Sequence, residues 1–165
     1  MKWLAGGLAA LILAGPAAAQ EVRRLDNPGS TFPIAAATVV PAGAELMFVS
    51  GLLPDVADTA APRGTPESYG STETQAKSVL GKIEASLKRE GLGLADIVQM
   101  RVFLVGDAKL GGKMDFEGLM KAYAPLFGTA EQPNKPARTV IQVVALPAPG
   151  AMVEIDVVAA KVRRP

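Results

Sequence analysis

The chain has 165 residues, of which 17 are Lys or Arg and 16 are Asp or Glu, and it contains neither His nor Cys. Without these two residue types it cannot build a Ser-His-Asp triad, a thiolate nucleophile or a zinc site of the usual kind, so we expect neither a metal nor a cofactor. The charges nearly balance and form no basic stripe, which argues against a nucleic-acid partner.

The first residues resemble a secretory signal peptide. Lys2 precedes an apolar stretch at residues 3–14, and the small residues Ala17 and Ala19 predict cleavage after Ala19. The stretch is short of the roughly 20 apolar residues that span a bilayer. We therefore expect a mature domain at residues 20–165, which is 165 minus 19, or 146 residues, and it should be periplasmic or secreted with no membrane contact.

The mature chain is long enough for one domain with a single core. Residues 35–40 and 46–50 are rich in strand-forming residues, and a Pro-Ala-Gly-Ala sequence between them predicts a turn, so the two strands are expected to pair as an N-terminal hairpin. Residues 52–70 contain three prolines and two glycines, which predicts a long loop without regular structure.

Two helices are expected after this loop. Residues 71–90 repeat apolar side chains at the helical period, with a capping box formed by Thr72 and Gln75 and a stop at Gly91. Residues 115–127 show the same one-sided pattern. Because each helix has a single apolar face, both can cover one side of a sheet.

The remaining segments predict strands. Residues 97–105 form one, while residues 138–146 and 152–161 flank a Pro-Ala-Pro-Gly turn and are expected to pair as a C-terminal hairpin. The resulting order, ββαβαββ, is typical of an α+β sandwich with two helices on one face of a mixed sheet. Since the last strands are apolar on both sides, the other face is expected to pack against further subunits.

Two carboxylates share one face of the last strand. Glu154 and Asp156 alternate with Val153, Ile155 and Val157, so the acidic side chains point one way and the apolar ones the other. An ordinary solvated face accounts for this pattern. The alternative is a functional carboxylate with a raised pKa or a fixed cationic partner, which the hydrophobic surroundings favour.

Two other positions are candidates for binding a small anion. Arg138 opens a strand beside apolar residues, where its guanidinium can present a bidentate fork to a carboxylate. Ser50 and Gly51 end an earlier strand, where a hydroxyl and backbone amides are available. A surface arginine and an ordinary strand exit are the plain alternatives.

Several sequence motifs together resemble the Rid family (RidA/YjgF, reactive intermediate deaminase). The most diagnostic lie in the expected C-terminal hairpin, and others precede them, so that the resemblance covers roughly residues 33–160. The motifs are PARTV at 136–140, VALP at 144–147, VEID at 153–156, FVSG at 48–51 and DIV at 96–98. The sequence departs from the family pattern at Ile34, where members carry a tyrosine, and at Met120, where asparagine is common.

The resemblance implies a chorismate-mutase-like (YjgF-like) ββαβαββ fold and a homotrimer with sites in clefts between subunits. It also implies hydrolysis of enamines and imines to ketones with release of ammonia. By resemblance, Arg138 would bind the substrate carboxylate, and Glu154 would position or activate water. Ser50 and Gly51 would line the pocket.

We therefore expect a 2-imino acid deaminase acting on a small carboxylate-bearing ligand. A non-catalytic periplasmic trimer that binds such a ligand in the same cleft is the alternative, favoured by the missing tyrosine at Ile34. An assembly or chaperone-like protein would instead expose apolar patches and would not depend on Arg138.

Overall fold

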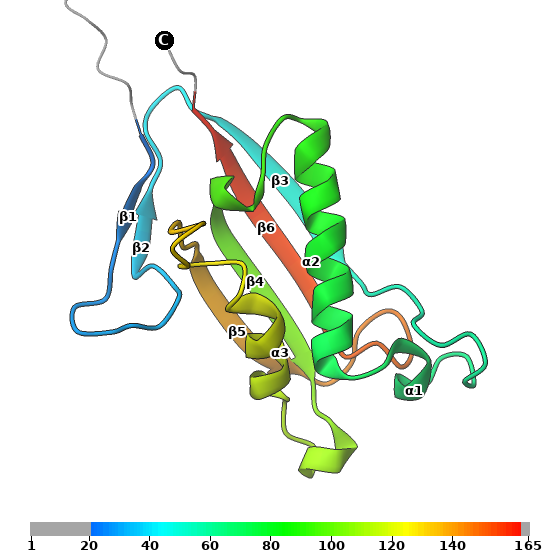
Figure 1. Cartoon of the computed structure of the whole chain (residues 1–165). Helices are drawn as coiled ribbons and strands as arrows, with labels where there is room; N and C mark the ends of the chain where they lie inside the picture. The colour runs from blue at the N-terminus through cyan, green and yellow to red at the C-terminus, as the bar shows by residue number, and fades with distance from the viewer. Residues whose placement is uncertain (1–20, 163–165) are drawn as a thin grey trace, which may run out of the picture.

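The computed structural model describes residues 21–162, so the expected signal peptide at residues 1–19 lies outside the described residues (Figure 1). The strands are β1 (Arg23–Leu25), β2 (Ala37–Val39), β3 (Glu45–Leu52), β4 (Ile97–Val105), β5 (Ala137–Val143) and β6 (Val153–Lys161). The helices are α1 (Pro66–Tyr69), α2 (Thr72–Arg89) and α3 (Phe116–Tyr123), with 3-10 turns η1 (Leu94–Asp96) and η2 (Ala108–Leu110). The predicted ββαβαββ order is present, with β1 and α1 added to it.

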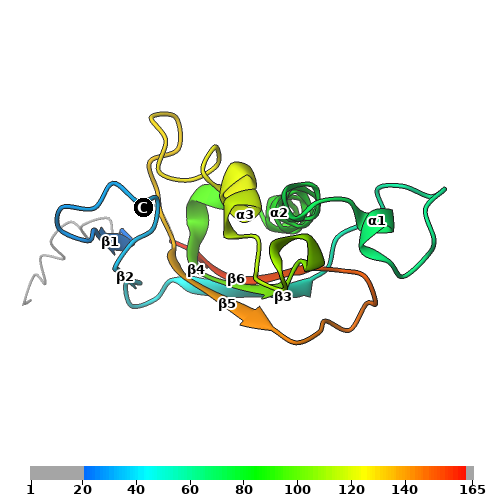
Figure 2. The same ribbon diagram turned by 90° about the horizontal axis from the view of Figure 1, so that it is seen from below.

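Four strands form the main sheet in the order β3-β6-β4-β5. The β4 and β5 strands are parallel and the other pairs antiparallel, so the sheet is mixed. Helices α2 and α3 lie side by side on one face of it, and the opposite face is uncovered in the single chain (Figure 2). The predicted α+β class, with two helices on one face of a mixed sheet, is confirmed.

Both predicted hairpins are wrong in their pairing. Strand β2 pairs with β1 in a separate two-stranded sheet, and β3 pairs with β6. Strand β6 lies between β3 and β4, while β5 pairs in parallel with β4. The apolar side chains of β6 explain its central place, because a central strand buries more of its surface than an edge strand.

The core lies between the helices and the sheet. The buried face of α2, which includes Ile83 and Leu87, packs on alternate residues of β4 and β6, such as Met100 and Ile155. Each of these four is at most 1 % exposed. This pattern confirms the one-sided helices and the alternation in the last strand. Within residues 21–162, no helix is both long and apolar enough to cross a membrane.

The start of α2 differs from the prediction. Ser71 is the N-cap, and its hydroxyl accepts a hydrogen bond from Thr74 N. The predicted capping box of Thr72 and Gln75 is absent, because Gln75 is fully buried and bonds elsewhere: it donates to Gly70 O and accepts from Met152 N. The loop before the helix also contains the single turn α1, in a segment where no regular structure was expected.

The β1–β2 arm is fastened to the sheet edge beside β4 and β5. Arg24 Nη2 donates to Ala95 O at 2.7 Å, and Thr38 Oγ1 donates to Val98 O at 3.1 Å. Ala35 forms an isolated bridge with Ala137 at the start of β5. The arm therefore brings the segment between β1 and β2 close to Arg138.

Candidate functional site

The two residues expected to act together lie on opposite faces of the sheet. Arg138 on β5 is paired with Met100 on β4, which is fully buried beneath the helices. Glu154 on β6 is paired with Phe103 on β4. Met100 and Phe103 are three residues apart, and side chains alternate along a strand, so they point to opposite faces. Arg138 thus lies on the helix-covered face and Glu154 on the uncovered one.

The guanidinium of Arg138 packs against aromatic rings. Phe116, Met120 and Tyr123 follow one another along a single face of α3, because positions i, i+4 and i+7 share a helix face. The Arg138 Cζ atom lies 4.0 Å from the ring centre of Tyr123, 5.5 Å from that of Phe32 and 5.9 Å from that of Phe116. A cation over an aromatic face is attracted by the ring quadrupole, so these rings hold the guanidinium in place.

Arg138 forms no ion pair with a carboxylate among the described residues, and the Tyr123 hydroxyl is the one oxygen there that interacts with its guanidinium. Its Nη1 and Nη2 atoms each lie 3.5 Å from Met120 Sδ, a weak acceptor, and its buried Nε has no partner within residues 21–162. Burial lowers the pKa of Arg138, but arginine remains a cation at neutral pH. A half-buried cation with unused donors is suited to receive an anionic ligand.

Tyr123 has a structural role in this arrangement. Its side chain is fully buried, and its hydroxyl donates to Pro33 O at 2.8 Å. Burial raises the pKa of Tyr123, and the nearby Arg138 guanidinium only partly opposes that rise. The phenol is therefore neutral, and it anchors the N-terminal arm beside Arg138.

The uncovered face brings Ser50, Gly51 and Glu154 together. The pairing of β3 with β6 shifts between Val49 and Leu52, so Ser50 and Gly51 form a β-bulge opposite a single residue of β6. A Cβ atom at Gly51 would collide with Glu154 Oε1, which shows that the carboxylate lies against the bare backbone of Gly51. A side chain at Gly51 would push the flexible end of Glu154 aside, so the glycine allows the carboxylate to lie at this position.

The second carboxylate on this face is engaged in an ion pair. Asp156 Oδ1 lies 2.9 Å from Arg101 Nε on β4, and this hydrogen bond raises the pKa of Arg101. No cation among residues 21–162 lies within ion-pair distance of Glu154. Asp156 is thus a structural partner of Arg101, while the Glu154 carboxylate remains available.

Phe32 and Arg101 belong to these surroundings and were not identified from the sequence. Phe32 and Arg138 are in contact although they lie more than a hundred positions apart in the sequence. No sequence pattern near either residue predicts this contact. The pair of Arg101 and Asp156 depends on β4 and β6 being neighbours, which the predicted hairpins did not include.

A separate hollow opens at the end of the sheet that carries the β5–β6 connection. Its volume is about 530 Å³, and segments near Glu67, Asp107 and Pro149 line it. None of Arg138, Glu154, Ser50 and Gly51 lines this hollow. Within the described residues, no group of three Asp or Glu side chains is placed to hold a metal ion.

Comparison with known proteins gives one family and many similar folds. Residues 33–161 match the model of the family described as Endoribonuclease L-PSP. Escherichia coli TdcF, solved with bound serine, is 28 % identical over 88 % of this chain and 98 % of its own, with a TM-score of 0.53.

Two further solved structures share the fold at lower identity. A member of the YjgF/YER057c/UK114 family from Mycobacterium tuberculosis is 23 % identical over 84 % of this chain and 98 % of its own, with a TM-score of 0.51. The Rid-family protein YyfB from Yersinia pestis, of unknown function, is 19 % identical over 84 % of this chain and 97 % of its own, with a TM-score of 0.61.

Proposed function

Because the chain belongs to the Endoribonuclease L-PSP family, to which the names YjgF and Rid also apply, we propose that it hydrolyses 2-imino acids and their enamine forms to keto acids and ammonia. The observation that carries this proposal is Arg138. It is a half-buried cation, held by aromatic rings and lacking a carboxylate partner among residues 21–162. Such a group fits the carboxylate of an imino acid.

The proposed reaction divides the work between two charged side chains. Arg138 binds the substrate carboxylate through two parallel N–H···O bonds, which fixes the position of the C=N carbon. Glu154 accepts a proton from water as the water oxygen adds to that carbon, and it passes this proton to the imine nitrogen to give a carbinolamine. Glu154 then moves the hydroxyl proton to the same nitrogen, the C–N bond breaks, ammonia leaves, and the C=O bond of the ketone forms. Ser50 and Gly51 line the pocket beside Glu154.

This division of work requires more than one subunit. Since Arg138 and Glu154 lie on opposite faces of one sheet, a site that uses both takes them from different copies of the chain. We propose a homotrimer with its sites between subunits. In support, apolar side chains lie exposed on the uncovered face, with Phe48 73 % and Ile141 45 % exposed.

A second candidate function is non-catalytic binding of a small carboxylate in the same cleft. Ile34 favours it, because an isoleucine stands where the family resemblance places a tyrosine, and it offers no hydroxyl to a substrate. The family description contains the word endoribonuclease, but a nucleic-acid substrate is disfavoured by the near balance of 17 basic and 16 acidic residues.

The place of action is part of the proposal. The pattern of residues 1–19 supports export to the periplasm or the medium, and the charge and hydropathy of the remaining chain support no membrane contact after cleavage.

The test compares the mature protein with Arg138→Ala. Ammonia and keto-acid release are measured from 2-iminobutyrate and 2-iminopropionate generated in situ, with circular dichroism and gel filtration as controls for fold and assembly. We expect turnover by the wild type and its loss in the variant, with assembly retained. Equal activity of the variant would overturn the role of Arg138, and no activity in a correctly assembled wild type would favour the ligand-binding function.

A further inference from the structure

Two exposed aromatic rings flank the unpartnered cation. Phe32 and Phe116 stack with their ring centres 6.2 Å apart and their planes 11° apart, and both lie within 6 Å of Arg138 Cζ. Phe32 is 38 % exposed and Phe116 is 36 % exposed. An anion that reaches Arg138 therefore meets uncovered aromatic surface beside its binding point.

We infer that the carboxylate ligand of Arg138 carries a long apolar or aromatic side chain, which packs against Phe32 and Phe116. The inference rests on the proposed function of this site and narrows it to the imino acids of bulky apolar amino acids. Phe32 is then a specificity-determining residue, because it supplies the aromatic surface that comes from outside α3.

The chemistry of the surroundings favours an apolar ligand side chain. The groups that the structure places around the guanidinium are three aromatic rings and the thioether of Met120. A polar ligand side chain would lose hydrogen bonds to water there without gaining partners. An apolar one gains about four-fold in affinity for each methylene group that becomes fully buried.

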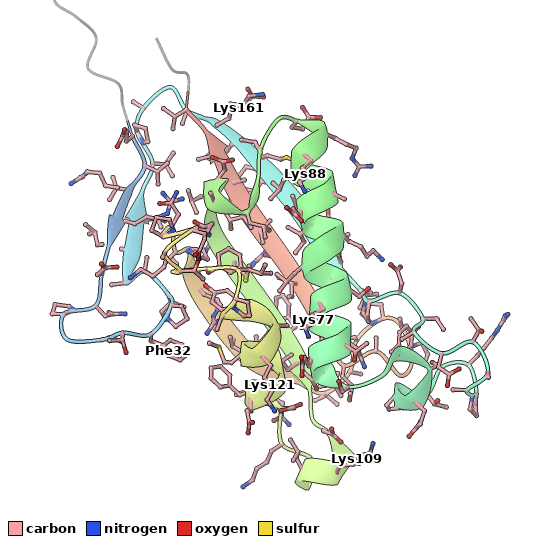
Figure 3. All side chains as sticks on the ribbon, in the orientation of Figure 1. Phe32, Lys77, Lys88, Lys109, Lys121 and Lys161 are labelled. Atoms are coloured by element: carbon pink, nitrogen blue, oxygen red, sulfur yellow. The ribbon has the colours of Figure 1, made fainter. Side chains whose placement is uncertain are left out.

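The arm that carries Phe32 is fixed on both sides of this residue. Phe32 N donates to Ser30 Oγ at 3.2 Å, and Pro33 O accepts the Tyr123 hydroxyl at 2.8 Å. Ala35 N donates to Pro136 O at 3.0 Å. Phe32 extends from this arm beside α3 (Figure 3). Its ring is therefore held at the site by the fold, as a specificity-determining residue must be.

Binding of unreactive carboxylates tests the inference without any turnover. Acetate, butyrate, hexanoate and phenylacetate are titrated into the mature, assembled protein and followed by NMR chemical-shift changes. We expect affinity to rise from acetate to hexanoate by about two-fold to four-fold per methylene, and phenylacetate to bind at least about 10-fold more tightly than acetate. Affinity that does not change with chain length, or no binding of any of the four acids, would overturn the inference.

Variants of Phe32 test whether this residue causes the increase of affinity with the chain length of the carboxylate. Phe32→Ser should remove most of the difference in affinity between acetate and hexanoate, a ratio measured within the one variant. Phe32→Leu should keep that difference, because leucine preserves the apolar surface. Leu25→Ala is the matched control, since Leu25 lies on the same arm and is 46 % exposed. If affinity still increases with chain length in Phe32→Ser, Phe32 is not the specificity-determining residue.

Hydrolysis measured beside binding separates this inference from the proposed function. Imines derived from norleucine and phenylalanine should be hydrolysed with kcat/KM at least about 10-fold above that of the alanine-derived imine. Chain-length-dependent binding without hydrolysis would support the ligand preference and refute the deaminase. Hydrolysis with no preference for bulky imines would support the deaminase and refute the preference.

Discussion

Each face of the four-stranded sheet carries a charged side chain without an oppositely charged partner, and the sign of that charge differs between the two faces. On the face covered by α2 and α3, the side chains are packed to near-complete burial, yet Arg138 has no carboxylate partner among residues 21–162. On the uncovered face, Glu154 has no cationic partner in the same range, and Phe48 is 73 % exposed. One face thus carries a cation without an anionic partner, and the other carries a carboxylate without a cationic partner.

This difference has a simple origin in strand geometry. Alternation along a strand sends neighbouring side chains to opposite faces, so one sheet can present two different chemical surfaces. The same geometry prevents Arg138 and Glu154 from meeting within one chain. The proposed division, with substrate binding on one face and water activation on the other, can be tested by changing each face separately.

The largest effect is expected on the uncovered face. Glu154→Gln keeps the size of the side chain but removes the base, and general acid–base catalysis contributes about 100-fold or more. We expect kcat for 2-imino acids to fall about 100-fold to 1,000-fold, while carboxylate binding, measured by NMR titration, stays within about two-fold because Arg138 is intact.

Asp156→Asn serves as the control for that change. Asp156 lies on the same face but is paired with Arg101, so its substitution should leave kcat nearly unchanged. If Glu154→Gln weakens binding and turnover equally, the two faces do not divide the work as proposed.

A second experiment tests whether the faces meet between subunits. Arg138→Ala and Glu154→Gln chains, each inactive alone, are co-expressed with different tags and purified as mixed assemblies. When each site takes one residue from each of two adjacent subunits, a trimer that contains both kinds of chain has one site of three with both residues intact. We expect about a third of the wild-type activity. Activity no higher than that of the single variants would show that the site does not form between subunits.

Much of the fold was predictable because it depends on local periodicity. The branched residues at 97–105 predicted β4 with its observed bounds, and the helical period predicted α2 to within one residue at each end. The strand partners were not predictable in this way. The turn after β5 suggested a hairpin, yet β4 lies between β5 and β6, because pairing is decided by which apolar strand the core encloses.

The candidate site was predictable in its residues and not in its geometry. Arg138, Glu154, Ser50 and Gly51 were identified through family motifs, and their roles remain predictions. The contact of Glu154 with Gly51 depends on a β-bulge, and bulges have no clear sequence signal here. The contact of Phe32 with Arg138 depends on the arm crossing the sheet edge, which only the tertiary structure shows.

The smallest effect concerns how the covered face holds the arm. Tyr123→Phe removes the hydroxyl that donates to Pro33 O at 2.8 Å and leaves that part-buried carbonyl without this partner. We expect a loss of about 1–2 kcal/mol in the free energy of unfolding and a fall in Tm of about 2–6 °C, measured by thermal unfolding. Carboxylate binding should persist, because the phenyl ring still lies against Arg138. On the outer side of the same helix, Lys121→Ala should change Tm by less than about 1 °C, since Lys121 and its partner Glu117 are 57 % and 82 % exposed. Equal losses of Tm in the two variants would contradict a stabilising role for the Tyr123 hydroxyl, and the arm would then depend on its other contacts, among them those of Arg24 and Thr38.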